Sequence, residues 1–356
     1  MPVLICGGGI VGASIAYFLS RRGVGSIVIE RCSPACGASG KGGGFLAADW
    51  SDGTPLEPLA KRSFALHAEL ARRLGNSWGH RGMQAYGGAG GAPDRHRPAS
   101  PRLGWLSDRV QLTGRLGAPA GTAQIHPGRF TEALLGAAQA GGAELRRGTV
   151  GGLLFEGSRA IGVEVDGVPL HGDAVVIAMG PWSQLARRWL PLPPVYGLKG
   201  HSLVYETGDA LPPEALFLEY GGDGGNICSP EIFPRADGTT YICAISSETP
   251  LPVDPADVGG DPGALERLER IAAEISPVLA GSRIVARQAC YRPITRDGLP
   301  LIGRVPGIGG AYVATGHSVW GILNAPATGE ALAELIVDGA ATTVPPAAFD
   351  PARFAG

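Results

Sequence analysis

The sequence predicts a two-domain α/β protein, in which a discontinuous Rossmann-like domain is joined to a domain built mainly on antiparallel sheet. The chain opens with an apolar run, Pro2 to Cys6, that leads into a glycine-rich turn and a segment with helical periodicity. Apolar strand-like runs return at Asp173–Gly180 and Ala311–Ala314. Between them, alternating runs such as Ser202–Tyr205 and Thr240–Ile245 are separated by turn residues, a pattern typical of antiparallel strands. A chain of 356 residues is long enough for two cores.

The opening turn has the glycine spacing of a dinucleotide-binding loop. Gly7 permits the tight turn from strand to helix, Gly9 lets the backbone approach a pyrophosphate, and Gly12 lets the helix pack closely on the strand. A second strand, Ser26–Ile29, ends at Glu30, about 20 residues on, where an acid accepts a hydrogen bond from a ribose hydroxyl. Strand, turn, helix, strand and acid in this order predict a nucleotide cofactor.

The predicted nucleotide-binding domain is assembled from three segments, 1–80, 123–195 and 284–356. The second domain takes the two segments between them, 81–122 and 196–283.

Four further stretches have a recognisable local pattern. The part from Gly79 to Leu116 is rich in Gly, Pro and Arg and predicts loops and short strands. Apolar residues at helical spacing predict helices at Gly128–Ala140, Pro262–Glu274 and Ala327–Asp338.

Composition narrows the class of partner. With 30 basic and 32 acidic residues the formal charge is −2, which gives no electrostatic reason to expect nucleic acid or an anionic membrane surface. No apolar run reaches the roughly 18 residues needed to span a bilayer. The cysteines form no Cys-x-x-Cys pair, so we expect neither a metal site nor disulfides; they are Cys6, Cys32, Cys36, Cys228, Cys243 and Cys290. We expect a cytoplasmic protein that binds a small molecule.

A second group of motifs stands near the C-terminus. Tyr291-Arg292-Pro293 is followed by Thr295-Arg296-Asp297-Gly298, and then by Gly316-His317-Ser318-Val319-Trp320-Gly321-Ile322. Together with the opening turn, the loop from Ala38-Ser39 to Gly44-Phe45 and the strand end Met179–Ser183, this order resembles the superfamily of FAD-dependent D-amino-acid oxidases, glycine oxidases and sarcosine oxidases. The resemblance covers nearly the whole chain.

The resemblance implies FAD bound in an extended form. It is expected to be noncovalent, because no cysteine follows Cys290. Backbone N–H groups of Trp320–Ile322, at the start of a helix, would stabilise negative charge that develops on the flavin. The implied cofactor-binding residues are Gly7, Gly9, Ile10, Val11, Gly12, Glu30, Arg31, Cys32, Ser39, Gly43, Gly44, Phe45, Val150, Ala178, Gly180, Trp182, Gly316, His317, Val319, Trp320, Gly321 and Ile322.

Arg292 is the principal candidate for substrate binding. In the family, the arginine of this motif binds the substrate carboxylate, since a planar guanidinium makes two parallel charge-assisted bonds to it. The alternative is a structural salt bridge. Tyr291 either walls the pocket or packs within a strand.

The chain departs from glycine oxidase-like relatives at two positions. Glu231 stands three residues before Pro234-Arg235, where those relatives have a tyrosine, and Val319 replaces an arginine. Glu231 would pair with a cationic amine or act as a base with a raised pKa, or it is a solvated residue at a strand edge. We expect His317 mainly to contact the cofactor, and the alternative is that it acts as a base.

The resemblance implies oxidation of the C–N bond of a small amino acid or N-substituted amino acid, with O2 as acceptor giving H2O2, or with another electron carrier. One alternative is an FAD-dependent 2-hydroxy-acid dehydrogenase, which needs His317 or Glu231 as a base for the hydroxyl proton. Another is a flavin-binding assembly or redox-sensing protein, for which slow and nonspecific flavin reduction would be the sign. Lys41 and Lys199 are expected to be solvated.

Overall fold

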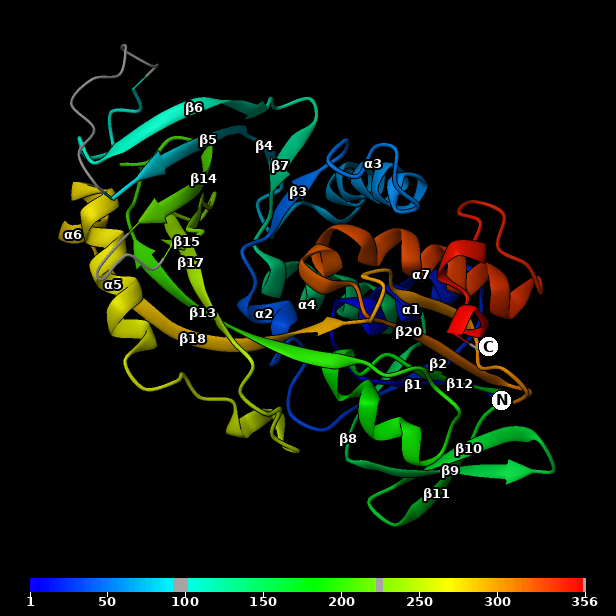
Figure 1. Cartoon of the computed structure of the whole chain (residues 1–356). Coiled ribbons are helices and arrows are strands. Elements are labelled where there is room, and N and C mark those ends of the chain that lie inside the picture. The colour runs from blue at the N-terminus through cyan, green and yellow to red at the C-terminus, as the bar shows by residue number, and fades with distance from the viewer. Residues whose placement is uncertain (92–101, 222–226, 355–356) are drawn as a thin grey trace.

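The structure is a computed structural model that describes residues 1–91, 102–221 and 227–354. Its two main sheets form two lobes, and the long strands β13 (Tyr196–Glu206) and β18 (Arg283–Ile294) run from one lobe to the other (Figure 1). The expected loop region Gly79–Leu116 contains β4 (Arg81–Gly82), β5 (Gln84–Gly90) and the start of β6 (Val110–Gly117), while its residues 92–101 lie outside the described part.

The first lobe is built on a sheet that, within the described residues, has six strands in the order β19-β20-β12-β1-β2-β8. All neighbouring pairs are parallel except β19 with β20. This is the predicted Rossmann-like topology, and its strands come from three separate parts of the chain. Their bounds are β1 Val3–Cys6, β2 Ser26–Glu30, β8 Glu144–Arg147, β12 Ala174–Ile177, β19 Leu301–Arg304 and β20 Ala311–Thr315.

Two apolar cores cover the two faces of this sheet. On one face Ile5 packs with residues of four helices, among them Ile15, Phe130 and Leu332. On the other, Leu4 packs with residues of the small sheet β11-β10-β9 and of a 3-10 helix. The helices are α1 (Ile10–Arg21), α3 (Glu57–Leu74), α4 (Pro127–Ala140) and α7 (Gly321–Val337); the other elements are β9 (Val150–Glu156), β10 (Arg159–Val165), β11 (Val168–His171) and η1 (Gly180–Arg188).

The glycine turn between β1 and α1 is packed as its spacing predicts. Gly7 has φ +114°, a backbone conformation that other residues rarely adopt, and a Cβ there would lie 2.4 Å from the Ala178 carbonyl oxygen. A Cβ on Gly12 would lie 2.0 Å from the Gly7 carbonyl oxygen. The start of α1 is therefore pressed against the end of β1, with no room for a side chain.

The second lobe is built on an eight-stranded, mostly antiparallel sheet in the order β18-β13-β17-β16-β14-β5-β6, with β15 beside β14, counted over the described residues. Helices α5 (Ala264–Ile275) and α6 (Pro277–Gly281) pack on one face, where Leu268, Ile271 and Leu279 join Leu203 and Leu216 in one core. The opposite face is turned toward the first lobe. The strands are β13 Tyr196–Glu206, β14 Glu214–Gly221, β15 Ile227–Cys228, β16 Glu231–Pro234, β17 Thr239–Ser247 and β18 Arg283–Ile294.

β18 connects the two lobes. It pairs with β13 along its whole length, from Arg283 to Ile294, and so belongs to the second sheet although the expected boundary was at residue 284. We therefore propose that the last passage between the domains lies just after Ile294. A small sheet of β3 (Phe45–Ala47), β7 (Thr122–Gln124) and β4 lies between β5 of the second sheet and helix α3 of the first lobe (Figure 1), and the short α2 (Ala38–Lys41) precedes β3 in the chain.

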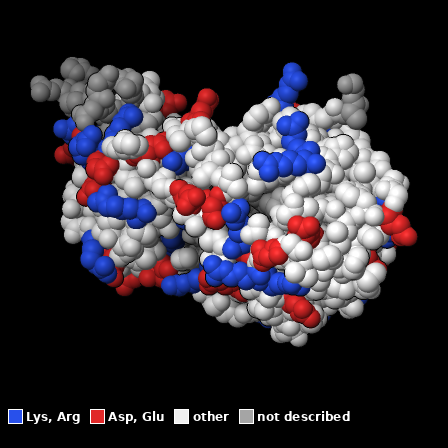
Figure 2. Space-filling view, turned by 90° about the horizontal axis from the view of Figure 1, so that it is seen from below, with Lys and Arg blue, Asp and Glu red and all other residues white. Residues whose placement is uncertain are grey.

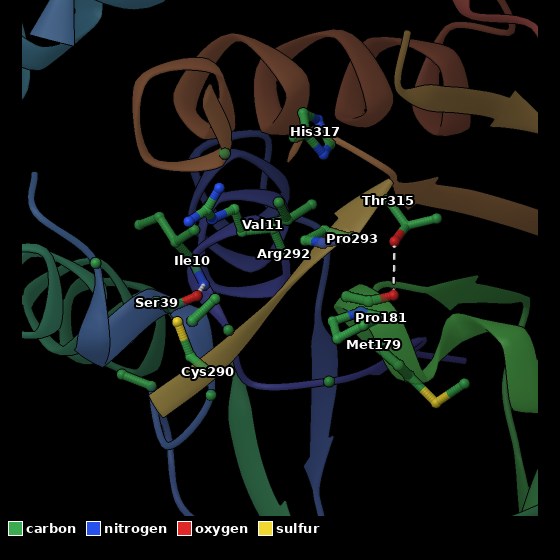
Figure 3. Close-up of a pocket in the computed structure, with 18 of the residues that line it drawn as sticks. Ile10, Val11, Ser39, Met179, Pro181, Cys290, Arg292, Pro293, Thr315 and His317 are labelled. Carbon is green, nitrogen blue, oxygen red and sulfur yellow. Dashed lines mark hydrogen bonds between the residues drawn. The ribbon is translucent and has the colours of Figure 1, made fainter. Parts of the chain in front are cut away.

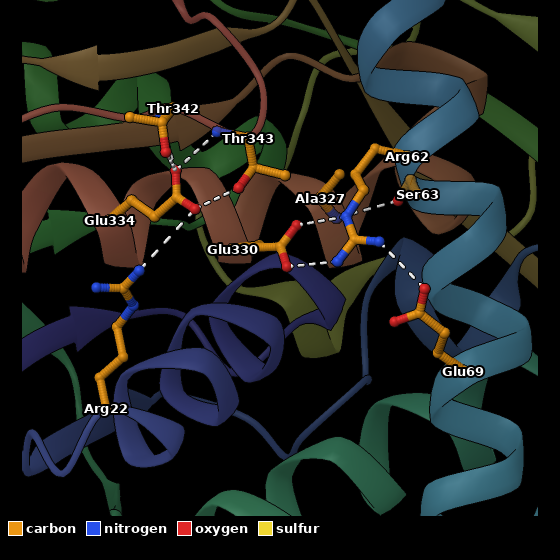
Figure 4. Close-up of polar contacts among 9 residues, drawn as sticks. All are labelled: Arg22, Arg62, Ser63, Glu69, Ala327, Glu330, Glu334, Thr342 and Thr343. Atoms are coloured by element: carbon orange, nitrogen blue, oxygen red, sulfur yellow. Dashed lines mark hydrogen bonds and ion pairs between the residues drawn. The ribbon is translucent and has the colours of Figure 1, made fainter.

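The last main helix begins earlier than the sequence pattern predicts, because α3 compensates for a proline inside it. α7 starts at Gly321 and contains Pro326, which cannot donate to the Ile322 carbonyl one turn before. His67 Nε2 of α3 lies 3.1 Å from that oxygen and donates to it. Ser63 accepts a hydrogen bond from Ala327 N at 3.1 Å, and nearby Arg62 pairs with Glu330 across the same helix pair (Figure 4).

Because His67 is completely buried, stability should depend on pH through this contact. Burial is the main reason that its pKa is lowered to about 3, so the unfolded chain takes up a proton between about pH 6.5 and pH 3 and the folded chain does not. We expect the unfolding free energy to fall in this window by up to about 1.4 kcal/mol per pH unit. His67→Gln should be less stable at pH 7 and show a shallower fall toward pH 5 in denaturant titrations. Parallel pH curves for the two proteins would contradict this prediction.

Charges on the surface are mixed, as the net charge suggests. Lys and Arg lie among Asp and Glu over the face shown in Figure 2. In the described part of the chain no helix is both long and apolar enough to cross a bilayer. The expected cellular location stays a prediction.

Candidate active site

A cavity of about 400 Å³ opens at the carboxyl ends of the parallel strands and extends to the face of the second sheet. Cys6 and Gly7 at the end of β1, Glu30 at the end of β2, Ala178 after β12 and Thr315 at the end of β20 all line it. Ligands of open α/β sheets bind at this edge.

The start of α1 forms one wall. Ile10 N donates to Ser39 Oγ at 2.9 Å, which joins the glycine turn to α2 (Figure 3). The Glu30 carboxylate accepts from Gly8 N at 2.7 Å and from Cys32 N at 2.8 Å, and its other lone pairs remain available to a ribose hydroxyl. A Cβ on Gly9 would lie 3.0 Å from Ser39 Oγ, so there is little room for a side chain at this position. Because Gly9 has no side chain, a pyrophosphate can approach the backbone there. The residues present fit the dinucleotide part of FAD.

The start of α7 also lines the cavity. Gly316 (φ +81°) makes the turn after β20, and the chain then passes through η4 (Ser318–Trp320) into the helix, so that the first N–H groups of α7 border the cavity. Thr315 Oγ1 donates to the Gly180 carbonyl at 2.8 Å and ties this turn to the end of β12 (Figure 3).

His317 lines the cavity but is held by α7. Its Nε2 lies 3.0 Å from Thr328 Oγ1, whose own hydrogen is donated to the Asn324 carbonyl. Nε2 must therefore carry the proton, and Nδ1 the lone pair. Burial lowers the pKa of His317 to about 4, so the ring is neutral at neutral pH and a weak base.

An acid lies at the far end of the cavity, on the second sheet. Glu231 of β16 pairs with Phe217 of β14 on one side and Cys243 of β17 on the other, and all three side chains line the cavity. The Cys243 thiol donates to Glu231 Oε2 at 3.7 Å. Desolvation raises the pKa of Glu231, while the positive charge of Arg292 opposes this rise. Glu231 is thus an internal residue of the sheet, and the alternative of a solvated strand edge is wrong.

The Arg292 guanidinium reaches across the same face of the sheet. It starts on β18, passes over Gly200 of β13, where a Cβ would lie 2.8 Å from Nη2, and donates from Nη2 to Ser246 Oγ of β17 at 3.0 Å. Its remaining N–H groups lie in a cavity that also holds the Glu231 carboxyl. Opposite charges therefore face one cavity from one sheet.

Aromatic residues that the sequence did not single out complete this end. Phe217, Phe233 and Tyr241 line the cavity from β14, β16 and β17, and Trp50 packs on Phe217 with ring centroids 4.9 Å apart. A Cβ on Gly43 would lie 2.4 Å from the Phe233 ring, so the loop after α2 is packed directly on this aromatic wall. Alternation along each strand was a usable signal, but the cavity side of each strand depends on pairing between distant segments.

Most of the expected site residues line the cavity, and four do not. Gly12 lies beneath the turn, where a Cβ would meet the Gly7 carbonyl, and Gly316 lies against the Thr295 side chain. Cys32 does not line the cavity, and its backbone N donates a hydrogen bond to Glu30. Those that line it are Gly7, Gly9, Ile10, Val11, Glu30, Arg31, Ser39, Gly43, Gly44, Phe45, Val150, Ala178, Gly180, Trp182, Glu231, Arg292, His317, Val319, Trp320, Gly321 and Ile322.

Tyr291 is the fourth: of the two alternatives left open for it, it packs within a strand and does not line the cavity. It neighbours Arg292 in a strand, so its side chain points to the opposite face of the sheet. There its ring lies 5.7 Å from Lys199 Nζ. Lys199 is only 6% exposed and is paired with Asp261 at 2.6 Å, so it is not a solvated lysine. Lys41 donates to the Ala289 carbonyl at 3.1 Å and is partly buried.

The chain is similar to known proteins over nearly its whole length. It is 30% identical to a Schizosaccharomyces pombe protein described as an oxidoreductase, with 98% of this chain and 97% of that one covered. It is 31% identical to a glycine oxidase of Geobacillus kaustophilus, over 94% of this chain and 92% of the relative. The solved glycine oxidase structure from the same organism superposes with a TM-score of 0.81, at 27% identity and 99% coverage of both chains.

The family model described as FAD dependent oxidoreductase, DAO, matches residues 2–335. The cofactor of this family is FAD, and the glycine turn, the position of Glu30 and the absence of a side chain at Gly9 suit the binding of a dinucleotide. The protein therefore belongs to the DAO family of FAD-dependent oxidoreductases.

Proposed function

We propose that the protein oxidises the C–N bond of a small amino acid or N-substituted amino acid to an imine, which water then hydrolyses to a 2-oxo acid and an amine. The observation that carries this proposal is the pair of opposite charges, Arg292 and Glu231, on the cavity face of one sheet. An amino acid has the complementary charges. The similarity to a glycine oxidase supports the same substrate class.

Arg292 would bind the substrate carboxylate through the N–H groups not used by Ser246. Glu231, whose pKa is raised by burial, would receive the ammonium of the substrate and take one proton from it, leaving the nitrogen lone pair free. FAD, when bound, supplies a hydride acceptor for the α-carbon hydrogen and passes the two electrons to O2, giving H2O2, or to another acceptor. Much of the rate would come from fixing the substrate between these two groups.

The same residues are less suited to the oxidation of a 2-hydroxy acid than to that of an amino acid. It requires a base for a hydroxyl proton, and His317 has a pKa lowered to about 4 and one ring nitrogen bound to Thr328. Glu231 would have to supply that function alone, and its carboxylate is a better partner for an ammonium group than for a hydroxyl.

The test is to supply the flavin-loaded protein, in air, with glycine, N-methylglycine, both enantiomers of alanine and proline, and the corresponding 2-hydroxy acids. We expect a 2-oxo acid, or a cyclic imine from proline, together with H2O2 from an amino acid. Turnover only with an added dye would replace O2 by another acceptor. Products from hydroxy acids alone would support the dehydrogenase alternative, and no product from any compound would support a flavin-binding role.

Gly200 offers a mild test of how Arg292 is seated. In Gly200→Ala the new methyl group meets the mobile end of Arg292, so the guanidinium must shift while the backbone stays in place. We expect KM for the amino acid to rise about tenfold, which corresponds to ~1.4 kcal/mol, with kcat and flavin content changed much less. Gly114→Ala, in β6 of the same sheet where a Cβ meets nothing within 4 Å, is the control. An unchanged KM in Gly200→Ala would mean that Arg292 does not hold the carboxylate in this orientation.

A further inference from the structure

The connection between β17 and α5 crosses from the second lobe to the nucleotide end of the cavity. Residues 249–263, here called the strap, follow the sheet and return to it at α5, with a short 3-10 helix, η3 (Pro255–Asp257), in the middle. Val253 and Pro255 line the cavity together with Glu30, Arg31 and Val150. In the sequence the strap is a Pro-, Gly- and Asp-rich linker with no evident role.

The middle of the strap is bound to the Rossmann-like lobe. Arg31, one residue after Glu30, donates to the Val253 carbonyl at 3.1 Å and pairs with Asp254 at 3.0 Å. Trp182 Nε1, from η1, donates to the Pro252 carbonyl at 2.8 Å. Asp254 also accepts from Ala256 N at 2.9 Å and so caps η3. Contacts from two separate elements therefore hold the strap at the nucleotide end.

The ends of the strap are bound to the back of the second sheet. Tyr291 Oη donates to the Pro250 carbonyl at 2.8 Å. Asp261 pairs with the buried Lys199 at 2.6 Å, accepts from Thr249 Oγ1 at 3.0 Å, and donates from its backbone N to His201 Nε2 at 2.9 Å. The pKa of Asp261 is lowered to about 2, mainly by its hydrogen bond with Lys199, so this anchor stays charged down to acidic pH. Tyr291, Lys199 and His201 thus share a structural task outside the cavity.

The position of Val253 indicates that the strap contacts a ligand in the cavity. The residue is 60% exposed although it lines the cavity, and Pro255 beside it lines the cavity too. The hydrogen bond from Arg31 to the Val253 carbonyl holds this apolar side chain at the cavity wall. A ligand that covers the side chain removes its apolar surface from water, which stabilises the bound state. The ligand expected beside Glu30 is the ribose and adenine of the cofactor.

We propose that the strap is an additional binding surface for the adenosine half of FAD, supplied by the second domain, and that it must open before FAD can leave. This inference rests on the cofactor and not on the proposed substrate. A failed substrate panel would leave it intact, and a failed strap experiment would leave the proposed reaction intact.

Hydrogen exchange on the unaltered protein is the first test. Backbone amides of the strap should exchange at least about tenfold more slowly with FAD bound than in the apoprotein, since exchange there requires opening. Peptides from α5, which directly follows the strap but packs on the far face of the sheet, are the internal control and should change less than about twofold. Equal exchange of the strap in both forms would overturn the proposal.

Release of FAD is the second test. Asp254→Ala combined with Tyr291→Phe removes one attachment in the middle and one at an end, and we expect FAD to leave about ten to a hundred times faster, measured from the rise of free-flavin fluorescence after dilution. Asp257→Ala removes the same charge from an exposed position of η3 and should release FAD at the unaltered rate. Equal release rates for the double variant and this control would also overturn the proposal.

Discussion

Arg292→Met is expected to lower kcat/KM for the amino acid substrate by about 10²- to 10³-fold while leaving FAD bound. Methionine keeps much of the length of the side chain and removes the charge, so the substrate carboxylate loses its partner in a cavity where water cannot fully replace it. Truncating one member of a desolvated charge pair costs about 2–5 kcal/mol. The flavin should stay bound because Arg292 is not one of the residues expected to hold it.

Arg296→Met is the matched control for this variant. Arg296 lies four residues further along the chain and is exposed, so the same substitution removes the same charge without reaching the cavity. We expect its kcat/KM to stay within about twofold of the unaltered value. If the two variants lose activity equally, Arg292 acts through overall charge or folding and not as a carboxylate ligand.

Gly12→Ala should abolish FAD binding and destabilise the fold by about 3 kcal/mol or more, the upper end for overpacking a core. The new Cβ would lie 2.0 Å from the Gly7 carbonyl oxygen and 3.3 Å from the Ile5 side chain, and no rotamer can relieve a collision of Cβ with backbone. Helix α1 must therefore move away from β1. That movement opens the turn that would receive the pyrophosphate.

Gly136→Ala separates this effect from the general consequence of replacing a glycine. Gly136 is an exposed residue within α4, where a Cβ meets nothing within 4 Å. Alanine is the better helix former, so this variant should gain about 0.5–1 kcal/mol. Denaturant unfolding and the flavin absorbance per protein check both variants. Stoichiometric FAD in Gly12→Ala would contradict the close packing of α1 on the turn.

The nucleotide half of the site could be predicted because it is encoded locally. Gly7, Gly9, Gly12 and Glu30 lie within one strand-turn-helix-strand unit, whose spacing alone fixes where each residue lies. The strand ends near Ala178 and Thr315 could be placed for a similar reason, since parallel strands end at the same edge of the sheet.

The substrate half depends on pairing between strands that are far apart in the sequence. Phe217, Glu231 and Cys243 become neighbours only through the register of β14, β16 and β17, and no local pattern determines that register. Tyr291 is different, because the alternation of a strand already required it to point away from Arg292. That signal was present in the sequence and was outweighed by the position of Tyr291 within the family motif.

The strap could not have been predicted from its own composition. A Pro-, Gly- and Asp-rich stretch predicts only a connection, and its attachment depends on Arg31, Trp182, Lys199 and Tyr291, which lie in four separate elements or turns. Contacts of this kind appear only once both lobes are assembled.

We propose that Arg292 and Glu231 hold an amino acid for oxidation by FAD. The most direct measurement is anaerobic mixing of the flavin-loaded protein with amino acids, N-methylated glycines and 2-hydroxy acids, followed at about 450 nm, where oxidised flavin absorbs. We expect rapid bleaching by an amine that carries a carboxylate, and the loss of this bleaching in Arg292→Met. No bleaching by any such amine, or equal bleaching in Arg292→Met, would contradict it.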